Sequence, residues 1–201
     1  MKDYILAGGD KRKVYEDFPK VAAKYPRYVE QMLKYRIEDE TEKILELVPK
    51  FQWQQFVLDY VNAVPSERDI LWVYCPNGNT GKTYLSKHLC DKYGAFYCNG
   101  GKGTDITFAY NGESTIVFDY VRDSKEYVNY GVIEQIKNGI LFSSKYESGM
   151  KRFTVPRVIV MANFLCDRTK FSRDRYNVID ISNPDDILEM RWEDLPAPRS
   201  P

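Results

Sequence analysis

Residues 75–83 constrain the fold of this chain more than any other feature, because they read Cys-Pro-Asn-Gly-Asn-Thr-Gly-Lys-Thr. The apolar run over residues 70–74 just before them is typical of a buried parallel strand. Residues 82–93 predict a helix, with Leu85 and Leu89 on one face. Glycines let backbone N–H groups wrap phosphate oxygens, and a helix N-terminus adds partial positive charge. Strand, glycine-rich loop and helix in this order therefore predict a phosphate-binding loop.

Individual residues of the loop suit a nucleotide with its metal ion, because Lys82 can reach terminal phosphates and Thr83 can ligate Mg²⁺. The strict pattern G-x-x-x-x-G-K-[ST] is not met, since Pro76 stands at its first glycine; a longer form, G-x-x-G-x-x-G-K-[ST], fits with Cys75 at its first glycine. The alternative is a glycine-rich turn with an incidental lysine, which the flanking strand and helix disfavour. The predicted nucleotide-binding residues are Pro76, Asn77, Gly78, Asn79, Thr80, Gly81, Lys82 and Thr83.

Two further apolar runs end in side chains that fit the same chemistry. Residues 116–118 lead into Asp119, which follows Thr83 by 36 residues and can hold Mg²⁺ through water. Residues 158–161 lead to Asn163, and an asparagine at such a strand end can contact a γ-phosphate and orient the attacking water. Either signal alone is weak, but with the loop they predict a phosphate site that includes a metal-binding carboxylate.

The alternation of short apolar strands with helical patterns predicts an α/β fold, with a parallel sheet flanked by helices. The first third of the chain predicts helices instead, since Pro26 can start one and Val29, Leu33 and Ile37 follow at helical spacing. Prolines near the C-terminus indicate a disordered tail. We therefore expect an all-helical segment over 1–65, a phosphate-binding domain over 66–183 and a tail over 184–201.

Composition excludes several classes of protein. His88 is the only histidine, which excludes metal sites and DNA nickases that need two or three. The four cysteines form no C-x-x-C pair, so a reducing compartment fits better than a disulfide framework or a zinc site. The sequence has no apolar run of about 18 residues, so it predicts no membrane-spanning helix. The 29 basic and 29 acidic residues balance, so any surface that binds nucleic acid must be local.

In combination, these motifs resemble the replication-associated proteins (Reps) of viruses with small circular single-stranded DNA genomes. The resemblance rests on residues 69–83, 116–119, 130–139 and 158–164, and covers roughly Tyr15 to Asn183. Nanovirus and alphasatellite Reps are nearest, and circovirus Reps are more distant. The resemblance implies a superfamily 3 helicase: an AAA+-like ATPase that uses ATP and Mg²⁺ and forms a hexameric ring around single-stranded DNA. It also implies rolling-circle replication in the host cell nucleus, with no membrane partner.

The resemblance implies roles for particular residues. Lys82 with its loop matches Walker A, Asp119 matches Walker B, and Asn163 matches the sensor asparagine of motif C. Arg175 resembles the arginine finger that reaches the nucleotide of a neighbouring subunit. The predicted catalytic residues are therefore Lys82, Asp119, Asn163 and Arg175. In the family a hairpin grips DNA in the pore of the ring; here the predicted DNA-binding residues, expected near one hairpin tip, are Lys145, Tyr146, Lys151 and Arg152.

Local charge agrees with a nucleic-acid partner, since residues 145–175 hold eight basic and three acidic residues, a net charge of +5. The alternative is a solvated basic face that binds nothing. In the family an endonuclease domain with a His-hydrophobe-His site precedes the helicase. One histidine cannot supply that site, so we expect this chain to be the C-terminal part of a Rep, with an oligomerisation segment from about Tyr15 to Val48.

Two departures from the family pattern leave alternatives open. Cys75 replaces a glycine, and its side chain can tighten the turn. Tyr120 follows Asp119 where many superfamily 3 members have a second acid, so the general base is Asp119 itself, Asp123 or an unassigned residue. The rival functions are a P-loop nucleoside or nucleotide kinase and an ATPase-dead module that binds DNA and oligomerises.

Overall fold

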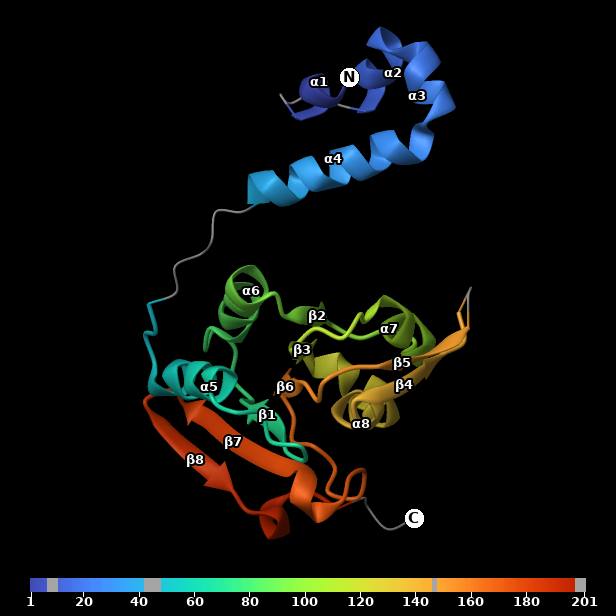
Figure 1. Cartoon of the computed structure of the whole chain (residues 1–201). Coiled ribbons are helices and arrows are strands. Elements are labelled where there is room, and N and C mark those ends of the chain that lie inside the picture. Colours follow the sequence, from blue (N-terminus) through green and yellow to red (C-terminus); the bar gives the residue numbers. More distant parts are fainter. Residues whose placement is uncertain (7–10, 42–47, 146–147, 198–201) are drawn as a thin grey trace. The chain divides into compact units, whose positions relative to one another are not determined.

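The computed structural model describes residues 1–6, 11–41, 48–145 and 148–197, and divides the chain into two units, Met1–Ile44 and Leu45–Pro201 (Figure 1). In the first unit, the helical unit, Pro26 opens the longest helix as predicted. Its side chains Ile5, Val14 and Val29 are fully buried against one another. The helices of this unit are α1 (Lys2–Leu6), α2 (Lys11–Asp17), α3 (Pro19–Lys24) and α4 (Pro26–Thr41).

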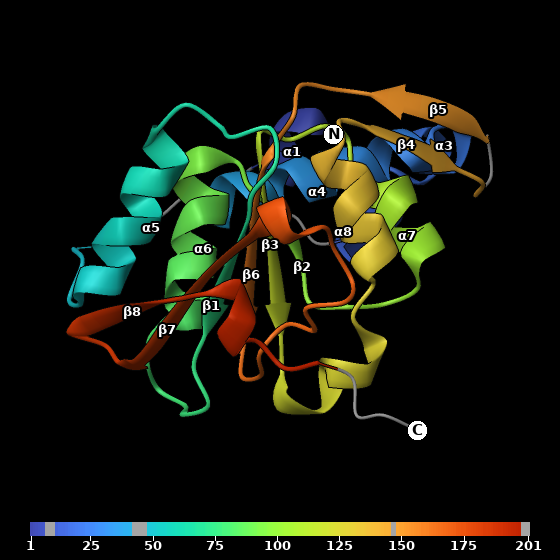
Figure 2. The same cartoon turned by 90° about the horizontal axis from the view of Figure 1, so that it is seen from below.

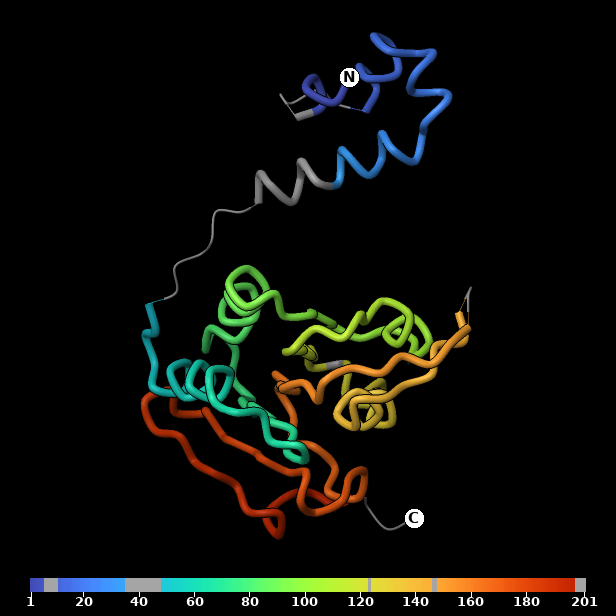
Figure 3. Tube along the Cα trace, viewed as in Figure 1, coloured from blue at the N-terminus to red at the C-terminus, as the bar shows by residue number. Residues whose placement is uncertain are grey.

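The second unit, the α/β unit, is built on a six-stranded sheet in the order β2-β3-β6-β1-β7-β8. Its first five strands are parallel, and only β8 runs antiparallel, so the predicted parallel α/β sheet is confirmed. Figure 3 lets the reader follow how the chain returns to place β6 and β7 on either side of β1. The strands are β1 (Ile70–Tyr74), β2 (Phe96–Cys98), β3 (Thr115–Tyr120), β6 (Arg157–Ala162), β7 (Tyr176–Asn183) and β8 (Asp186–Met190).

Helices cover both faces of the sheet, with α5 and α6 on one side and α7 and α8 on the other (Figure 2). Because side chains alternate along a strand, Leu71 and Val73 of β1 pack toward α5 and α6, while Ile70 and Trp72 pack toward α7 and α8. The helices are α5 (Gln52–Asn62), α6 (Lys82–Tyr93), α7 (Gly103–Ala109) and α8 (Tyr130–Lys137), with short 3₁₀ turns η1 (Arg122–Tyr127), η2 (Arg173–Arg175) and η3 (Trp192–Asp194).

The predicted domain boundary at residue 65 differs from the structure. Trp53 and Val57 of α5 are fully buried in the same core as β1 and β6, so α5 belongs to the α/β unit and not to the helical segment. The predicted tail also begins too early. Residues 186–190 form β8 beside β7, and Leu195 beyond it is buried in the core. A short edge strand followed by prolines gives too little apolar periodicity to be recognised in the sequence.

A two-stranded hairpin stands apart from the main sheet. Its strands are β4 (Ile140–Ser143) and β5 (Gly149–Arg152), which pair antiparallel beside α7 and α8. This confirms the hairpin layout expected between the Asp119 and Asn163 strands. None of the described helices is long and apolar enough to cross a membrane.

Candidate functional site

The strand register brings the three predicted motifs to one edge of the sheet. Val73 of β1 and Asp119 of β3 both pair with Met161 of β6, one on each side of it. The glycine-rich loop therefore starts beside the strand end that carries Asp119. Asn163 follows β6 at the same edge. Parallel strands end together, which is why motifs far apart in sequence meet here.

Two residues of the loop have left-handed backbone conformations. Gly81, the residue before α6, has φ +81°, and Asn79 has φ +61°. A Cβ on Gly81 would lie 2.8 Å from Nε2 of Gln54, so glycine is required there for both conformation and space. The Cys75 thiol donates to the carbonyl of Asn77 at 3.3 Å, which tightens the turn as the sequence suggested.

This loop forms one wall of a cavity of about 410 Å³, called here the phosphate cavity. Lys82 is 9% exposed, and its Nζ donates to Oγ1 of Thr80 at 3.4 Å. Burial lowers the pKa of Lys82, while the nearby Asp119 opposes that shift. An anion in the cavity would add negative charge beside this buried ammonium. The cavity is lined by Gly78, Asn79, Thr80, Gly81, Lys82, Thr83, Tyr84, Asp119, Tyr120, Val121 and Asn163.

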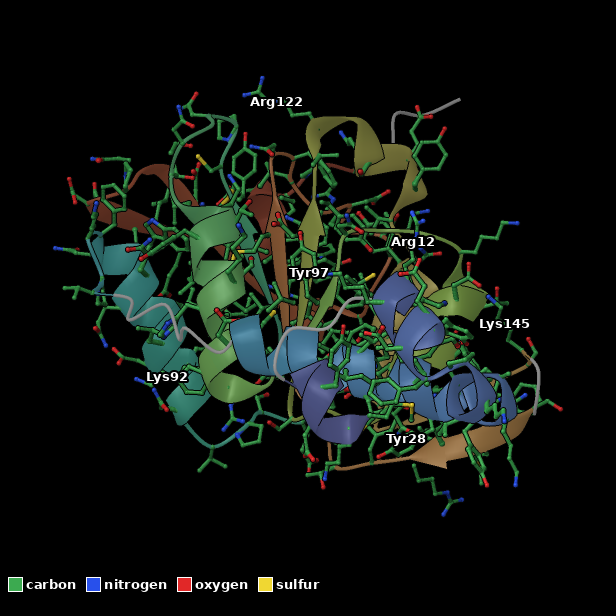
Figure 4. The ribbon with its side chains drawn as sticks, turned by 90° about the horizontal axis from the view of Figure 1, so that it is seen from above. Arg12, Tyr28, Lys92, Tyr97, Arg122 and Lys145 are labelled. Atoms are coloured by element: carbon green, nitrogen blue, oxygen red, sulfur yellow. The ribbon has the colours of Figure 1, made fainter. Side chains whose placement is uncertain are left out.

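Two hydroxyl groups donate to the same carboxylate oxygen of Asp119. Oγ1 of Thr83 lies 3.2 Å from Oδ2, and the hydroxyl of Tyr97 lies 3.3 Å from it. Burial, followed by the proximity of Asp119, raises the pKa of Tyr97 to about 12, so the phenol stays protonated and donates. Sequence reasoning missed Tyr97, which Figure 4 labels; its only signal was a polar side chain in the short strand next to β3.

Asn163 and Arg122 both attach to the start of the loop. The Nδ2 group of Asn163 donates to the carbonyl of Cys75 at 2.8 Å and to that of Asn77 at 3.3 Å. Arg122 extends from η1 toward the loop, and its Nη2 donates to the carbonyl of Pro76 at 3.4 Å (Figure 4). The predicted Pro76 and Asn77 thus serve the site through backbone carbonyls, whereas the residues from Gly78 to Thr83 line the cavity.

Tyr120, at the position of the expected second acid, cannot act as a general base. It is 1% exposed, its ring stacks on Phe118, and its hydroxyl has no hydrogen-bond partner in the described part of the chain. Burial raises its pKa further above the usual tyrosine value. Of the named candidates for the base, Asp119 lies in the cavity wall, and the side chain of Asp123 lies outside the described residues.

The predicted arginine finger is not on the surface. Arg175 is 2% exposed; its Nη2 donates to Oδ1 of Asn138 at 2.6 Å, and its Nε lies 3.2 Å from Oε1 of Glu134. A guanidinium enclosed by its own chain cannot reach a neighbouring subunit without leaving these partners. The position therefore corrects the prediction, and it assigns Arg175 a structural contact with α8.

The basic residues predicted to bind DNA are spread along the hairpin and do not meet at its tip. Arg152 pairs with Ile140 at the end farthest from the turn, whereas Ser143 pairs with Gly149 next to the turn. Lys151 donates to the carbonyls of Phe108 and Tyr110 at 2.7 and 2.6 Å. Lys145 pairs with Asp105 of α7, Arg152 is exposed, and Tyr146 lies outside the described residues.

The net charge of +5 over residues 145–175 does not form one surface. Nη2 of Arg157 donates to the carbonyl of Ala63, and Arg175 is buried. Arg168 and Arg173 both lie against the ring of Trp192, and Arg173 also pairs with Glu193. The fold thus directs these cations to different places, which a count along the sequence cannot reveal.

The site suits a hard divalent cation held largely by water. Among the described residues there is no group of three or more histidine, cysteine, aspartate or glutamate side chains that could enclose a metal ion. The hydroxyl of Thr83 and the carboxylate of Asp119 offer two oxygens at the wall of an open cavity. Mg²⁺ keeps several waters and takes one or two protein oxygens together with substrate phosphates, so the residues fit that ion.

Comparison with known proteins agrees with this arrangement. A family model described as "RNA helicase" matches residues 71–164. The "Master replication protein" of Faba bean necrotic yellows virus (isolate Syrian SV292-88) is 50% identical over 118 residues, 57% of this chain and 41% of that protein. The "Master replication protein" of Subterranean clover stunt virus (strain F) is 37% identical over 185 residues, which are 84% of this chain and 63% of that protein. "Para-Rep C10" of Milk vetch dwarf C10 alphasatellite is 36% identical over 189 residues, which are 88% of this chain and 66% of that protein. The chain thus spans 41% to 66% of these relatives.

Proposed function

We propose that this chain, which belongs to the family of replication-associated proteins of nanoviruses and alphasatellites, is the ATP-hydrolysing helicase part of such a protein. A role in viral replication and a helicase-type domain come with the family. ATP as the substrate, Mg²⁺ as the cofactor and single-stranded DNA as the partner are parts of the proposal. So are rolling-circle replication in the host cell nucleus and assembly into a hexameric ring.

The observation that carries the proposal is the convergence of Lys82, Thr83, Asp119 and Asn163 on one cavity. Lys82 neutralises terminal phosphate charge, which matters most in the transition state of phosphoryl transfer. The backbone N–H groups around Gly81 hold the phosphate oxygens. Thr83 and Asp119 would hold Mg²⁺, which when bound would supply positive charge beside the phosphates.

Asn163 is suited to orient the attacking water. Its Nδ2 is fixed by two loop carbonyls, so its Oδ1 has a defined direction at the cavity wall. An amide oxygen in that position can accept a hydrogen bond from water. Asp119 is the remaining described carboxylate of the cavity, so it is the group to which that water would pass its proton, directly or through another water.

The two arginines that suggested a kinase, Arg173 and Arg175, do not line the phosphate cavity. Arg173 is engaged with Trp192 and Glu193, and Arg175 is buried beside α8, so neither lines the phosphate cavity as a clamp. The ATPase-dead module remains a distinct outcome of measurement, because Tyr120 stands in place of the second acid.

Phosphate release by the purified chain, with and without single-stranded oligonucleotide, tests the proposal. We expect Mg²⁺-dependent hydrolysis of ATP that single-stranded DNA stimulates. Stimulation by single-stranded RNA in place of DNA would change the partner while keeping the ATPase. Phosphoryl transfer to a nucleoside would point to the kinase, and nucleotide binding without any turnover would point to the inactive module.

A further inference from the structure

A second cavity, of about 470 Å³, lies against the phosphate cavity and is called here the lateral cavity. The two cavities share Asn79, Gly81 and Tyr84. The rest of the lateral cavity comes from the segment that leads into α5 and from the first turn of that helix, so it lies outside the matched range 71–164. Its lining residues are Val48, Lys50, Phe51, Gln54, Asn79, Gly81 and Tyr84.

The position of the two cavities gives a bound nucleotide a direction. Lys82, Asp119 and Asn163 line only the phosphate cavity, and a lysine at that place of the loop reaches the β- and γ-phosphates. The terminal phosphate therefore belongs at the Lys82–Asp119 end. The remainder of the nucleotide would then extend past Gly81 and Tyr84, which line both this cavity and the lateral cavity.

We propose that the lateral cavity holds the base of the nucleoside triphosphate, an inference that rests on the proposed ATPase function. The cavity is in the size range of small-ligand sites, and its lining combines Val48, Phe51 and Tyr84 with the polar side chains of Lys50, Gln54 and Asn79. Val48 is 77% exposed and Tyr84 is 41% exposed at its rim, and Phe51 lies beside them half-buried. These side chains offer aromatic and aliphatic surface against which a planar ring can pack.

Gln54 supplies a directed polar group in this cavity. It is 2% exposed, and its Oε1 accepts a hydrogen bond from the backbone N–H of Lys50 at 2.9 Å. This fixes the amide so that Nε2 faces the backbone of Gly81, 2.8 Å from the position that a Cβ would take. The hydrogen bond described for this amide is the one that Oε1 accepts, and it leaves the Nε2 group out. Nε2 is therefore a donor for a ring nitrogen or carbonyl oxygen of the base.

A third cavity, of about 420 Å³, is the alternative place for the base, but it adjoins the wrong end. It is lined by Asn99, Gly100, Gly101, Lys102, Tyr120, Ser124 and Tyr127, and shares only Tyr120 with the phosphate cavity. Tyr120 follows Asp119, so this cavity opens at the end assigned to the terminal phosphate. Tyr127, which is 72% exposed, therefore provides a matched control for Tyr84.

The test compares binding of Mg²⁺-ATP with that of Mg²⁺-tripolyphosphate, which has the phosphates but no base, by isothermal titration calorimetry on the full chain. We expect the wild-type chain to bind ATP more tightly than tripolyphosphate. Tyr84→Ala, Val48→Ser and Gln54→Met should each weaken ATP binding, by roughly fivefold or more for the lost aromatic contact of Tyr84. Val48→Ser and Gln54→Met should leave the affinity for tripolyphosphate unchanged, because neither residue lines the phosphate cavity. Tyr84 lines both cavities, so Tyr84→Ala should weaken ATP binding more than tripolyphosphate binding. Tyr127→Ala should change the affinity for neither ligand.

Several results would overturn the inference. One is equal affinity of the wild-type chain for the two ligands, and another is unchanged ATP affinity in both Tyr84→Ala and Val48→Ser. Loss of ATP affinity only in Tyr127→Ala would move the base to the third cavity. If neither ligand binds the wild-type chain, the proposed function fails together with the inference. Circular dichroism separates a folding defect of Gln54→Met from a binding defect, and the exposed Val48 and Tyr84 keep the test decisive.

Discussion

Oγ1 of Thr83 and Oδ2 of Asp119 lie 3.2 Å apart, although 36 residues separate them in the sequence. The loop after β1 and the end of β3 come together because β6 pairs with both strands. The hydroxyl of Tyr97 reaches the same oxygen from β2 at 3.3 Å. The carboxylate is thus oriented before any ligand arrives, which limits the reorganisation that metal and nucleotide binding require.

Tyr97→Phe should weaken the binding of the Mg²⁺ on which hydrolysis depends. The variant keeps the ring and removes only the hydroxyl that orients Asp119, so a higher Mg²⁺ concentration should be needed for half-maximal rate. Hydrogen bonds to charged groups contribute about 1.5–3 kcal/mol, so we expect kcat to fall by roughly tenfold with little change in KM for ATP. Phosphate release over a Mg²⁺ titration measures both quantities.

Tyr127→Phe is the control for this experiment, because it removes a hydroxyl from an exposed tyrosine that does not line the phosphate cavity. It should behave as the wild-type chain does. An unchanged Mg²⁺ titration in Tyr97→Phe would remove Tyr97 from the positioning of Asp119.

Arg175→Ala should destabilise the fold. It should not behave like the loss of an arginine that acts on the nucleotide of a neighbouring subunit. The substitution removes a buried guanidinium together with its contacts to Glu134, whose side chain is 39% exposed, and to Asn138. Loss of hydrogen bonds that involve a charged group costs about 1.5–3 kcal/mol, and the partial exposure of Glu134 reduces this, so thermal unfolding should occur at a lower temperature. Arg173→Ala is the control, since that side chain is 70% exposed.

Mixing Arg175→Ala with Lys82→Ala separates the two roles of this arginine. A buried structural arginine predicts no recovery of hydrolysis in the mixed oligomer. Recovery of activity, together with unchanged thermal stability of Arg175→Ala, would restore the arginine-finger role that the sequence predicted.

Arg152→Ala and Phe142→Ala should weaken binding of single-stranded DNA. Ile140, Phe142, Met150 and Arg152 occupy one exposed face of the hairpin, whereas Lys151 faces α7. The lost cation should lower the slope of log K against log salt by roughly 0.7. The lost ring removes a surface for base stacking without changing that slope.

Fluorescence anisotropy with a labelled oligonucleotide over a salt series measures both effects. Lys151→Ala provides a contrast, because its ammonium is bound to two carbonyls and its loss acts through the packing of the hairpin. Affinities and slopes that match the wild-type values in both Arg152→Ala and Phe142→Ala would exclude this face from DNA binding.

Lys137 gives the stability of the fold a pH dependence. Its side chain is fully buried, and its Nζ donates to the carbonyls of Ser66 and Pro156. Burial lowers its pKa to about 8; Asp69 opposes that shift, and Arg157 and Arg175 add to it. In the unfolded chain the value returns to about 10.4. Between these values only the unfolded chain binds the proton, so this residue makes stability rise with pH.

The free energy of unfolding of the wild-type chain should therefore increase relative to that of Lys137→Met from about pH 8 to about pH 10. Urea titrations at several pH values measure the difference, and the comparison cancels the other groups that titrate there. A constant difference across this range would show that Lys137 keeps its ordinary pKa in the folded chain.

The strands and the loop at the centre of the site were predictable because their signals are local. The apolar runs that end at Tyr74 and Phe118 are long enough to identify a strand, and Gly81 with Lys82 marks the start of α6. Asp119 and Asn163 could be placed at one edge because parallel strands end together.

The remaining features depend on contacts that sequence patterns do not encode. Tyr97 reaches Asp119 only because β2 pairs with β3 in one particular register. Arg175 follows a basic stretch in sequence, but its partners Glu134 and Asn138 lie in and just after α8. The register of the hairpin places Arg152 away from the tip. Helix α5 belongs to the α/β unit because Trp53 is buried in the core of that unit.

The central claim is that Lys82 and its loop hold the phosphates of ATP for hydrolysis. Phosphate release by the wild-type chain and by Lys82→Ala, with circular dichroism on both, tests it most directly. We expect the variant to keep the wild-type spectrum and to lose nearly all turnover, because the buried ammonium is the charge that the terminal phosphates need. Near-normal turnover in a correctly folded Lys82→Ala chain would contradict the account.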